Sequence, residues 1–320
     1  MKERIGKMSL LKLQAPCKDY IWGGQRLINE YNKRSETGTA AESWELSCNE
    51  ESPSIIVNGR YAGRTLLDYI NEKGKKVVGK NSEGLSDFPL LVKLIDAREA
   101  LSVQVHPDDK YASEHEKSYG KTEMWYVLDA EEDAFIYYGL NRQITEEELK
   151  RRIEDMTISD VLNAVPVSKG DVFFIEAGTL HAIGNGILIA EIQQNSCLTY
   201  RVYDYGRRDK NGKFRDLHIN DAVNVTKRQP VKKIKGMYPH LASCKYFTVD
   251  KLHLSGDYLD KITGFVDERS FMHVLFLDGE GRIQSGEDDL HFRKGDSFFL
   301  PASSGDFDIF GKCEALITTV

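Results

Sequence analysis

Short apolar runs separated by turn-forming residues recur along most of this chain. The first series is rich in β-branched and aromatic residues and occupies 53–59, 88–97, 101–106, 123–130, 133–139 and 171–178. A second series begins after residue 231 and occupies 245–254, 270–279, 289–302, 306–311 and 314–320. Such runs are typical of β-strands, and the short connection DAEED (129–133) favours antiparallel pairing. The pattern predicts a mainly β protein with two β units.

One segment interrupts the strand pattern. In 144-ITEEELKRRIEDMTISDVLNAV-165, Thr145 precedes Glu148, and Thr157 precedes Asp160, at the spacing of a helix-capping box. We therefore expect two short helices near 144–165, inserted in the first β unit. The basic segment KRQPVKKIKG (227–236) contains proline and is the candidate linker. It divides the chain into predicted domains at 1–232 and 233–320.

Part of the sequence forms an internal repeat. The stretch 170-GDVFFIEAGTLHAIGN-185 returns as 295-GDSFFLPASSGDFDIFG-311, and 123-EMWYVLDA-130 aligns with 272-MHVLFLDG-279. The two parts begin 47 residues apart in the first copy and 23 in the second, a difference close to the length of the helical insert. Antiparallel strands in two sheets, with Gly-Asp at a strand entry and a histidine past its turn, describe a double-sheet jelly roll of the cupin type. We expect two cupin (double-stranded β-helix) domains.

Composition narrows the class of protein. The length of 320 residues and a hydrophobic content of 41% suit two ordinary domains. No apolar run approaches the roughly 18 residues that cross a bilayer, so a soluble cytoplasmic protein is expected, with no membrane partner. The five cysteines are odd in number and lack CxxC spacing, which argues against disulfides and thiolate zinc sites. The net charge of -7 argues against a nucleic-acid partner and leaves room for an anionic small molecule at a local cationic patch.

Four polar residues of the first repeat form a candidate metal site. Gln104 and His106 alternate on a predicted strand, so both side chains leave the same face. Glu123 begins the next strand and His181 follows the Gly-Asp strand, which adds a carboxylate and a second imidazole. Zinc takes such ligands, and Fe(II), Mn(II), Co(II) and Ni(II) suit them as well. A single buried histidine is more often satisfied by a backbone carbonyl, but the four residues together favour a metal.

The second repeat lacks this set of residues. Met272 stands in the position of Glu123, and Asp306 stands in the position of His181. We therefore expect the second domain to be a degenerate cupin without metal ligands.

Several segments carry a more specific resemblance. The opening motif fits the second cupin motif, G-x5-P-x-G-x2-H-x3-N, with Glu176 in place of proline. The chain resembles the type I mannose-6-phosphate isomerases in their short bacterial form at YIWGG (20–24), AESWELS (41–47), LLVKLIDAREALSVQVHPDD (90–109), GKTEMWYVL (120–128), AGTLHAIGNG (177–186) and EIQQNSCLTYRVYDYGR (191–207). Residues 231–320 resemble the family only weakly. The resemblance implies one zinc ion per chain, held by Gln104, His106, Glu123 and His181, and a catalytic arginine at Arg201.

The implied reaction interconverts mannose 6-phosphate and fructose 6-phosphate through a cis-enediol. Arg201 is permanently charged and suits stabilisation of the enediolate. Glu191 is the candidate general acid/base, on the expectation that partial desolvation raises its pKa; the alternative is a strand glutamate paired with a surface lysine. Candidates for binding the phosphate are Lys93, Ser102 and Lys121. The two lysines have a second interpretation, as surface charges or partners of Glu123.

Two other functions stay open on the sequence. A non-enzymatic bicupin that binds a sugar phosphate would use the same fold. An Fe(II)-dependent cupin dioxygenase would use the same ligands and would consume oxygen. The sequence does not determine the native metal, the exact sugar, the role of the second domain, or whether the protein is a monomer or a homodimer.

Overall fold

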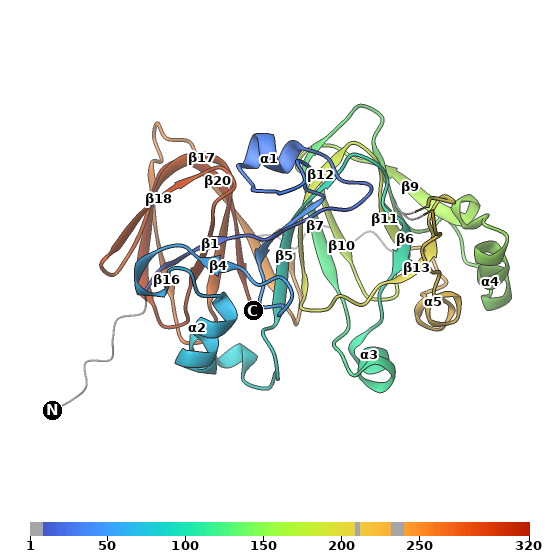
Figure 1. The fold of residues 1–320 in the computed structure, drawn as a ribbon, viewed down its shortest axis with the longest axis horizontal. Coiled ribbons are helices and arrows are strands. Elements are labelled where there is room, and N and C mark those ends of the chain that lie inside the picture. Colours follow the sequence, from blue (N-terminus) through green and yellow to red (C-terminus); the bar gives the residue numbers. More distant parts are fainter. Residues whose placement is uncertain (1–8, 209–211, 232–239) are drawn as a thin grey trace.

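The computed structural model describes residues 9–208, 212–231 and 240–320, which fold into two β-barrels side by side (Figure 1). All strand pairs are antiparallel, and the mainly β architecture expected from the sequence is confirmed. The described residues also form five α-helices: α1 (Arg26–Tyr31), α2 (Leu66–Lys73), α3 (Asp109–Glu116), α4 (Glu146–Glu154) and α5 (Ile219–Val225). Among these residues no helix is both long enough and apolar enough to cross a membrane.

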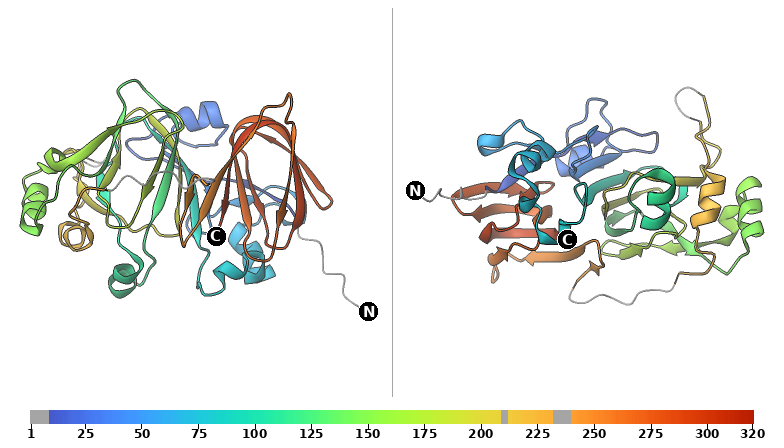
Figure 2. Two further views of the ribbon diagram at one scale, coloured as in Figure 1. Left: turned by 180° about the vertical axis from the view of Figure 1, so that it is seen from behind. Right: turned by 90° about the horizontal axis from the view of Figure 1, so that it is seen from below.

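Two sheets form the first barrel. The six-stranded sheet has the order β10 (Val172–Ile175), β7 (Glu123–Ala130), β12 (Ile187–Gln194), β5 (Leu90–Ala97), β3 (Glu42–Leu46) and β2 (Cys17–Lys18). The five-stranded sheet has the order β13 (Tyr200–Tyr203), β6 (Val103–Val105), β11 (His181–Ile183), β8 (Phe135–Leu140) and β9 (Leu162–Pro166). Helices α4 and α5 lie at the end of this barrel away from the second barrel, as Figures 1 and 2 agree.

The second barrel is built on one nine-stranded sheet. Its main order is β14 (Ala242–Ser243), β15 (Thr248–Leu254), β20 (Gly305–Thr319), β17 (Met272–Ser285), β19 (Ser297–Leu300), β1 (Leu11–Gln14) and β4 (Ile55–Ile56). Strand β16 (Lys261–Val266) pairs with β20, and β18 (Asp288–Arg293) pairs with β17. The two terminal runs predicted at 306–311 and 314–320 are one continuous strand, β20. Two strands from the beginning of the chain thus extend the sheet of the second barrel.

The register of the strands confirms the internal repeat. In the first barrel Glu123 pairs with Ile175, and in the second Met272 pairs with Leu300. Ile175 and Leu300 occupy the same place after their Gly-Asp pairs. Met272 therefore stands where Glu123 stands, in a ladder of the same geometry.

The helical insert was predicted only in part. Helix α4 begins after Thr145, whose side chain accepts a hydrogen bond from the backbone N–H of Glu148. The second predicted helix is wrong: only a 3-10 turn, η4 (Ile158–Val161), forms, and Thr157 makes no side-chain cap. The chain then enters β9, which pairs with β8. The hydrogen bonds of this sheet edge replace those that a longer helix would have made.

The six-stranded sheet is the side of the first barrel that faces the second barrel (Figure 1). Strands β5 and β12 are buried at every position, as expected for strands covered on both faces. The face turned to the second barrel carries Leu90, Met124 and Ile192, which share a buried cluster with Leu275 and Phe299. The opposite face lines the first barrel and carries the polar candidates. The predicted domain boundary at 232/233 and residues 232–236 of the predicted linker lie outside the described residues.

Candidate metal and active site

His106, Glu123 and His181 come together inside the first barrel, where each is at most 1% exposed. The Nε2 atom of His106 lies 3.5 Å from Oε2 of Glu123, and Nε2 of His181 lies 3.4 Å from Oε1. One potential ligand atom from each of the three residues lies within 4.8 Å of the others. The strand β7 supplies the carboxylate, and the opposite sheet supplies the two imidazoles.

Backbone carbonyls hold both imidazoles in one orientation. The Nδ1 of His106 lies 2.8 Å from the carbonyl oxygen of Leu198, and the Nδ1 of His181 lies 2.8 Å from that of Thr179. A neutral ring that donates from Nδ1 leaves its Nε2 as a lone pair. Burial lowers the pKa of His106 well below its ordinary value and lowers the pKa of His181 to about 4, so both rings are neutral. Both Nε2 atoms therefore carry a lone pair: that of His181 has no hydrogen-bond partner, and that of His106 faces Nζ of Lys121 at 3.2 Å.

The chemistry of this donor set fits a divalent cation. Among the described residues, Nε2 of His181 and Oε1 of Glu123 are buried and have no hydrogen-bond partner. Burial raises the pKa of the Glu123 carboxyl to about 7, because desolvation outweighs the nearby lysines. Buried polar atoms without partners carry a large cost, which a bound metal ion removes. Two neutral imidazoles and a carboxylate are typical ligands of zinc and its neighbours.

Gln104 lies at the edge of this cluster. In the five-stranded sheet its Cα pairs with His181 on one side and with Arg201 on the other. Directly opposite residues point to the same face of a sheet, so Gln104, His181 and Arg201 project together into the barrel. The role of Gln104 as a fourth ligand stays a prediction.

Lys121 is a close neighbour of the ligands and is only 5% exposed. Its Nζ lies 2.8 Å from Oε2 of Glu123 and 3.2 Å from Nε2 of His106. Of the two interpretations that the sequence left open for Lys121, these contacts favour a partner of Glu123.

A buried polar network extends from the metal cluster across the six-stranded sheet. Oε1 of Glu191 accepts a hydrogen bond from Nε1 of Trp125 at 3.0 Å, and Oε2 lies 3.5 Å from Nζ of Lys93. The same ammonium lies 3.3 Å from Oε2 of Glu42, which accepts a hydrogen bond from Nε1 of Trp44 at 2.7 Å. Lys93 is thus a buried cation between two carboxylates.

The surroundings of Glu191 correct one expectation. Burial raises its pKa, but the cations of Lys121 and Lys93 outweigh burial, and the net pKa of Glu191 is lowered. The raised pKa expected from the sequence is wrong. Glu191 is therefore an ionised carboxylate that pairs with Lys93 and is further stabilised by the charge of Lys121.

Glu42 is a member of this network that sequence reasoning missed. Its signal was present in AESWELS, where Glu42 and Trp44 alternate on one strand and therefore share a face. What the sequence could not supply was the pairing of β3 with β5, which sets Trp44 opposite Lys93.

Arg201 is partly exposed and lies on β13, the edge strand of the five-stranded sheet. Its Nε donates to Oγ of Ser102 at 3.2 Å, and its Nη1 donates to the carbonyl oxygen of Asp216 at 3.0 Å. Arg207 and Arg215 lie close by, and both form ion pairs with Asp204. We name Arg201, Arg207 and Arg215 the arginine rim. Its three guanidinium groups outnumber the two nearby carboxylates, Asp204 and Asp216, so the rim carries net positive charge.

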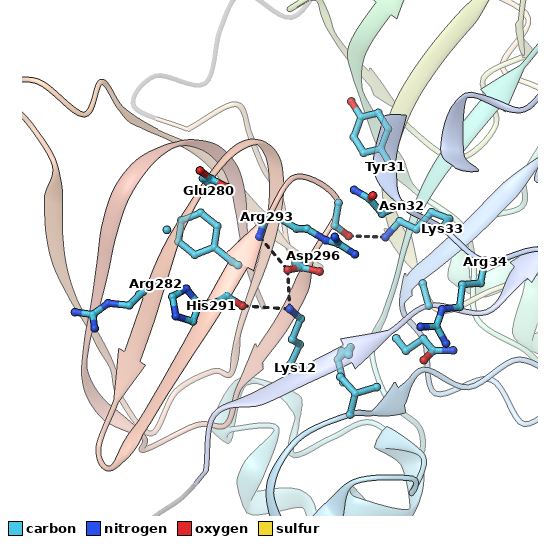
Figure 3. Close-up of a pocket in the computed structure, with 17 residues that line it drawn as sticks. Lys12, Tyr31, Asn32, Lys33, Arg34, Glu280, Arg282, His291, Arg293 and Asp296 are labelled. Atoms are coloured by element: carbon cyan, nitrogen blue, oxygen red, sulfur yellow. Dashed lines mark hydrogen bonds and ion pairs between the residues drawn. The ribbon is translucent and has the colours of Figure 1, made fainter. Parts of the chain in front are cut away.

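A different cleft, of about 800 Å³, lies between the second barrel and the segment after α1 (Figure 3). It is lined by several cations, but Lys12 is paired with Asp296 and Lys33 with Glu45. None of the candidate ligands or catalytic residues lines it. This cleft is therefore separate from the candidate metal site of the first barrel.

Two jelly-roll barrels, one with a buried His-Glu-His cluster beside ionised polar groups, define a bicupin with a candidate metal site. Residues 10–159 match the model of the catalytic domain of type I phosphomannose isomerase, and residues 238–320 match that of the mannose-6-phosphate isomerase cupin domain. The chain belongs to the type I phosphomannose isomerase family, as its sequence motifs suggested.

Individual relatives agree with this assignment along most of the chain. Mannose-6-phosphate isomerase ManA of Bacillus subtilis is 38% identical over 311 residues, covering 94% of this chain and 96% of the relative. The mannose-6-phosphate isomerase of Streptococcus mutans is 38% identical over 314 residues, covering 96% of each. The crystal structure of the mannose 6-phosphate isomerase from Bacillus subtilis has a TM-score of 0.87 and 34% identity, over 98% of this chain and 100% of that one. A zinc-bound mannose 6-phosphate isomerase shares the fold, with a TM-score of 0.76 and 17% identity over 97% and 99% of the two chains.

Proposed function

We propose that this protein interconverts mannose 6-phosphate and fructose 6-phosphate through a cis-enediol, with one zinc ion held by Gln104, His106, Glu123 and His181. The observation that carries the proposal is the His106–Glu123–His181 cluster, in which Nε2 of His181 and Oε1 of Glu123 have no hydrogen-bond partner. Glu191 and Arg201 lie in the same barrel. A bound metal ion would supply Lewis-acid polarisation of the substrate oxygens. Other divalent metals suit the same ligands.

Proton transfer between C1 and C2 of the open-chain sugar requires a base. We assign this role to Glu191, because it is ionised and can accept a proton at once. The hydrogen bond from Trp125 and the ion pair with Lys93 hold its carboxylate in one orientation. Return of that proton to the neighbouring carbon, together with transfer of a hydroxyl proton between O2 and O1, completes the isomerisation without net gain or loss of atoms.

Arg201 is assigned to the negative charge that develops on the sugar oxygens in the enediolate. The hydrogen bonds to Ser102 and to the backbone of Asp216 orient its guanidinium. A cation held in this way needs no reorientation when the negative charge develops.

We assign the phosphate to the positively charged arginine rim around Arg201. Ser102 remains a candidate there, and we add Arg207 and Arg215 of the arginine rim. Lys93 and Lys121 were candidates for the same task. Their ion pairs with buried carboxylates favour a charge-balancing role instead.

One assay tests the function. The protein as purified is mixed with mannose 6-phosphate, and formation of fructose 6-phosphate is followed with and without a chelator, and again after Zn²⁺ is restored. We expect turnover that the chelator removes and zinc returns. Binding without turnover would favour the non-enzymatic bicupin, and oxygen uptake would favour the dioxygenase. A cytoplasmic location and a monomer or homodimer stay predictions.

A further inference from the structure

A chain of hydrogen bonds connects the second barrel to the metal cluster of the first. At its centre is Asp109, the first residue of α3. Oδ2 of Asp109 accepts a hydrogen bond from the Tyr246 hydroxyl at 2.6 Å and another from Nζ of Lys245 at 3.0 Å. Both donors belong to the connection between β14 and β15 of the second barrel. The lysine is largely exposed, so the tyrosine is the more specific partner.

The other oxygen of the same carboxylate faces the first barrel. Oδ1 of Asp109 accepts from Nε2 of Gln194 at 2.9 Å and from the backbone N–H of Gly120 at 3.2 Å. The buried amide of Gln194 accepts in turn, through Oε1, from the backbone N–H of Thr122 at 2.9 Å. These bonds hold both ends of the segment 120–122.

This segment leads directly into the metal cluster. Lys121 lies at its centre, with Nζ 2.8 Å from Oε2 of Glu123, and Glu123 is the next residue after its end. A displacement of the segment would move the ammonium and rotate the carboxylate. Groups that orient ligands in this way typically change metal affinity by 10- to 100-fold when they are removed.

We propose that the second barrel positions Lys121 and Glu123 through Tyr246, Asp109 and Gln194, which we name the Asp109 relay. In this account Asp109 and Tyr246 are positioning residues, and the degenerate barrel has a role in the activity although it lacks the metal ligands. The inference rests on the proposed function, because it assigns the relay to the same metal site.

Two features separate the relay from ordinary packing. Asp109 is held as a carboxylate, since hydrogen bonds from Tyr246, Gln194 and Lys245 outweigh its burial and lower its pKa. Asp109, Gln194 and Tyr246 also line a cavity of about 710 Å³. Their positions are therefore set by hydrogen bonds on that side and not by close-packed neighbours. Removing a single hydroxyl there requires no repacking of a core.

The test uses the full-length protein with its metal. Tyr246→Phe removes one hydrogen bond at nearly constant volume, and Asp109→Asn replaces one acceptor oxygen with a donor. The matched control is Lys80→Met, which removes the exposed contact of Lys80 with Glu268, another link between the N-terminal segments and the second barrel. For each variant, zinc affinity is measured by competition with a chelator, together with kcat, KM and Tm.

We expect Asp109→Asn to weaken zinc binding and lower kcat by about 10- to 100-fold, with KM within about twofold of wild type. Tyr246→Phe should show the same changes to a smaller extent, and Lys80→Met should show neither. Variants with wild-type zinc affinity and kcat, changed only in Tm, would overturn the inference. A wild-type protein without turnover would instead refute the proposed function.

Discussion

Lys93 offers a sharp test of how the buried network works. Replacing it with methionine removes the cation and keeps a side chain of similar length. Its Nζ lies 3.3 Å from Glu42 and 3.5 Å from Glu191, and each pair contributes roughly 5 kcal/mol of gross attraction at an effective dielectric constant of about 20. The two carboxylates stay buried in the variant, so the net loss of stability should be about 3–5 kcal/mol. This corresponds to a fall in Tm of about 4–8 °C for a chain of this length.

The same substitution should change the pH dependence of catalysis. Lys93 is one of the two cations that lower the pKa of Glu191. Without it the pKa rises, the carboxylate protonates at higher pH, and the acidic limb of kcat/KM moves to higher pH. If Lys93 bound the phosphate instead, KM would rise while Tm and the position of the acidic limb stayed as in wild type.

The matched control combines Lys93→Met with Glu42→Gln. One cation and one carboxylate are lost together, so the net charge of the network is the same as in wild type. Thermal unfolding and pH profiles are measured for the single and the double variant, and the double variant should recover part of the lost stability. A single variant with wild-type Tm and an unmoved acidic limb would refute our account of Lys93.

Three further predictions follow from the structure. Arg201→Ala should lower kcat by about 10²–10³-fold with zinc content intact, measured by steady-state kinetics and metal analysis; a loss confined to KM would make Arg201 a binding residue. Burial lowers the pKa of His273 to about 3, below its value of about 6.5 in the unfolded chain. Between these two pH values the unfolded state binds more protons than the folded state. The free energy of unfolding therefore falls as the pH drops from about 6.5 towards 3, by up to about 1.4 kcal/mol per pH unit. His273→Gln should abolish this contribution. In urea unfolding, the stability of the variant relative to wild type should therefore increase between pH 7 and pH 4.5. A difference in stability that is the same at both pH values would contradict the assignment. Deleting residues 233–320 should leave an insoluble remnant, because β1 loses its partner β19 and the shared core is exposed. A soluble, fully active remnant would show that the second barrel is dispensable.

The sequence carried much of the metal site. The predicted grouping of His106, Glu123 and His181 matches the cluster in the structure, because strand periodicity decides which face a side chain leaves. The place of Gln104 among the ligands stays a prediction. The register of Met272 against Leu300 likewise bears out the repeat. Helix α4 could be predicted from its N-terminal cap. The helix predicted after Thr157 is limited to a 3-10 turn, because the following residues pair as strand β9.

Other features depended on contacts between segments distant in the chain. The role of Lys93 on β5 depends on Glu42 and Glu191, which lie on the two strands that flank β5 and are 149 residues apart in the chain. The pKa of Glu191 depends on two lysines whose distance no local pattern encodes, and burial alone predicted the wrong direction. The Asp109 relay joins residues 109, 194 and 246, which no motif connects.

The amino-acid sequence by itself therefore determined the β class, the internal repeat, the residue types of the His-Glu-His cluster and the family, since periodicity and residue chemistry are local properties. Only the tertiary structure decided which charges neutralise one another, which lysines are buried, and how the second barrel is hydrogen-bonded to the first. The physical reason is that electrostatic and hydrogen-bond energies depend on distances in space, and the folded chain brings together residues that the sequence keeps far apart.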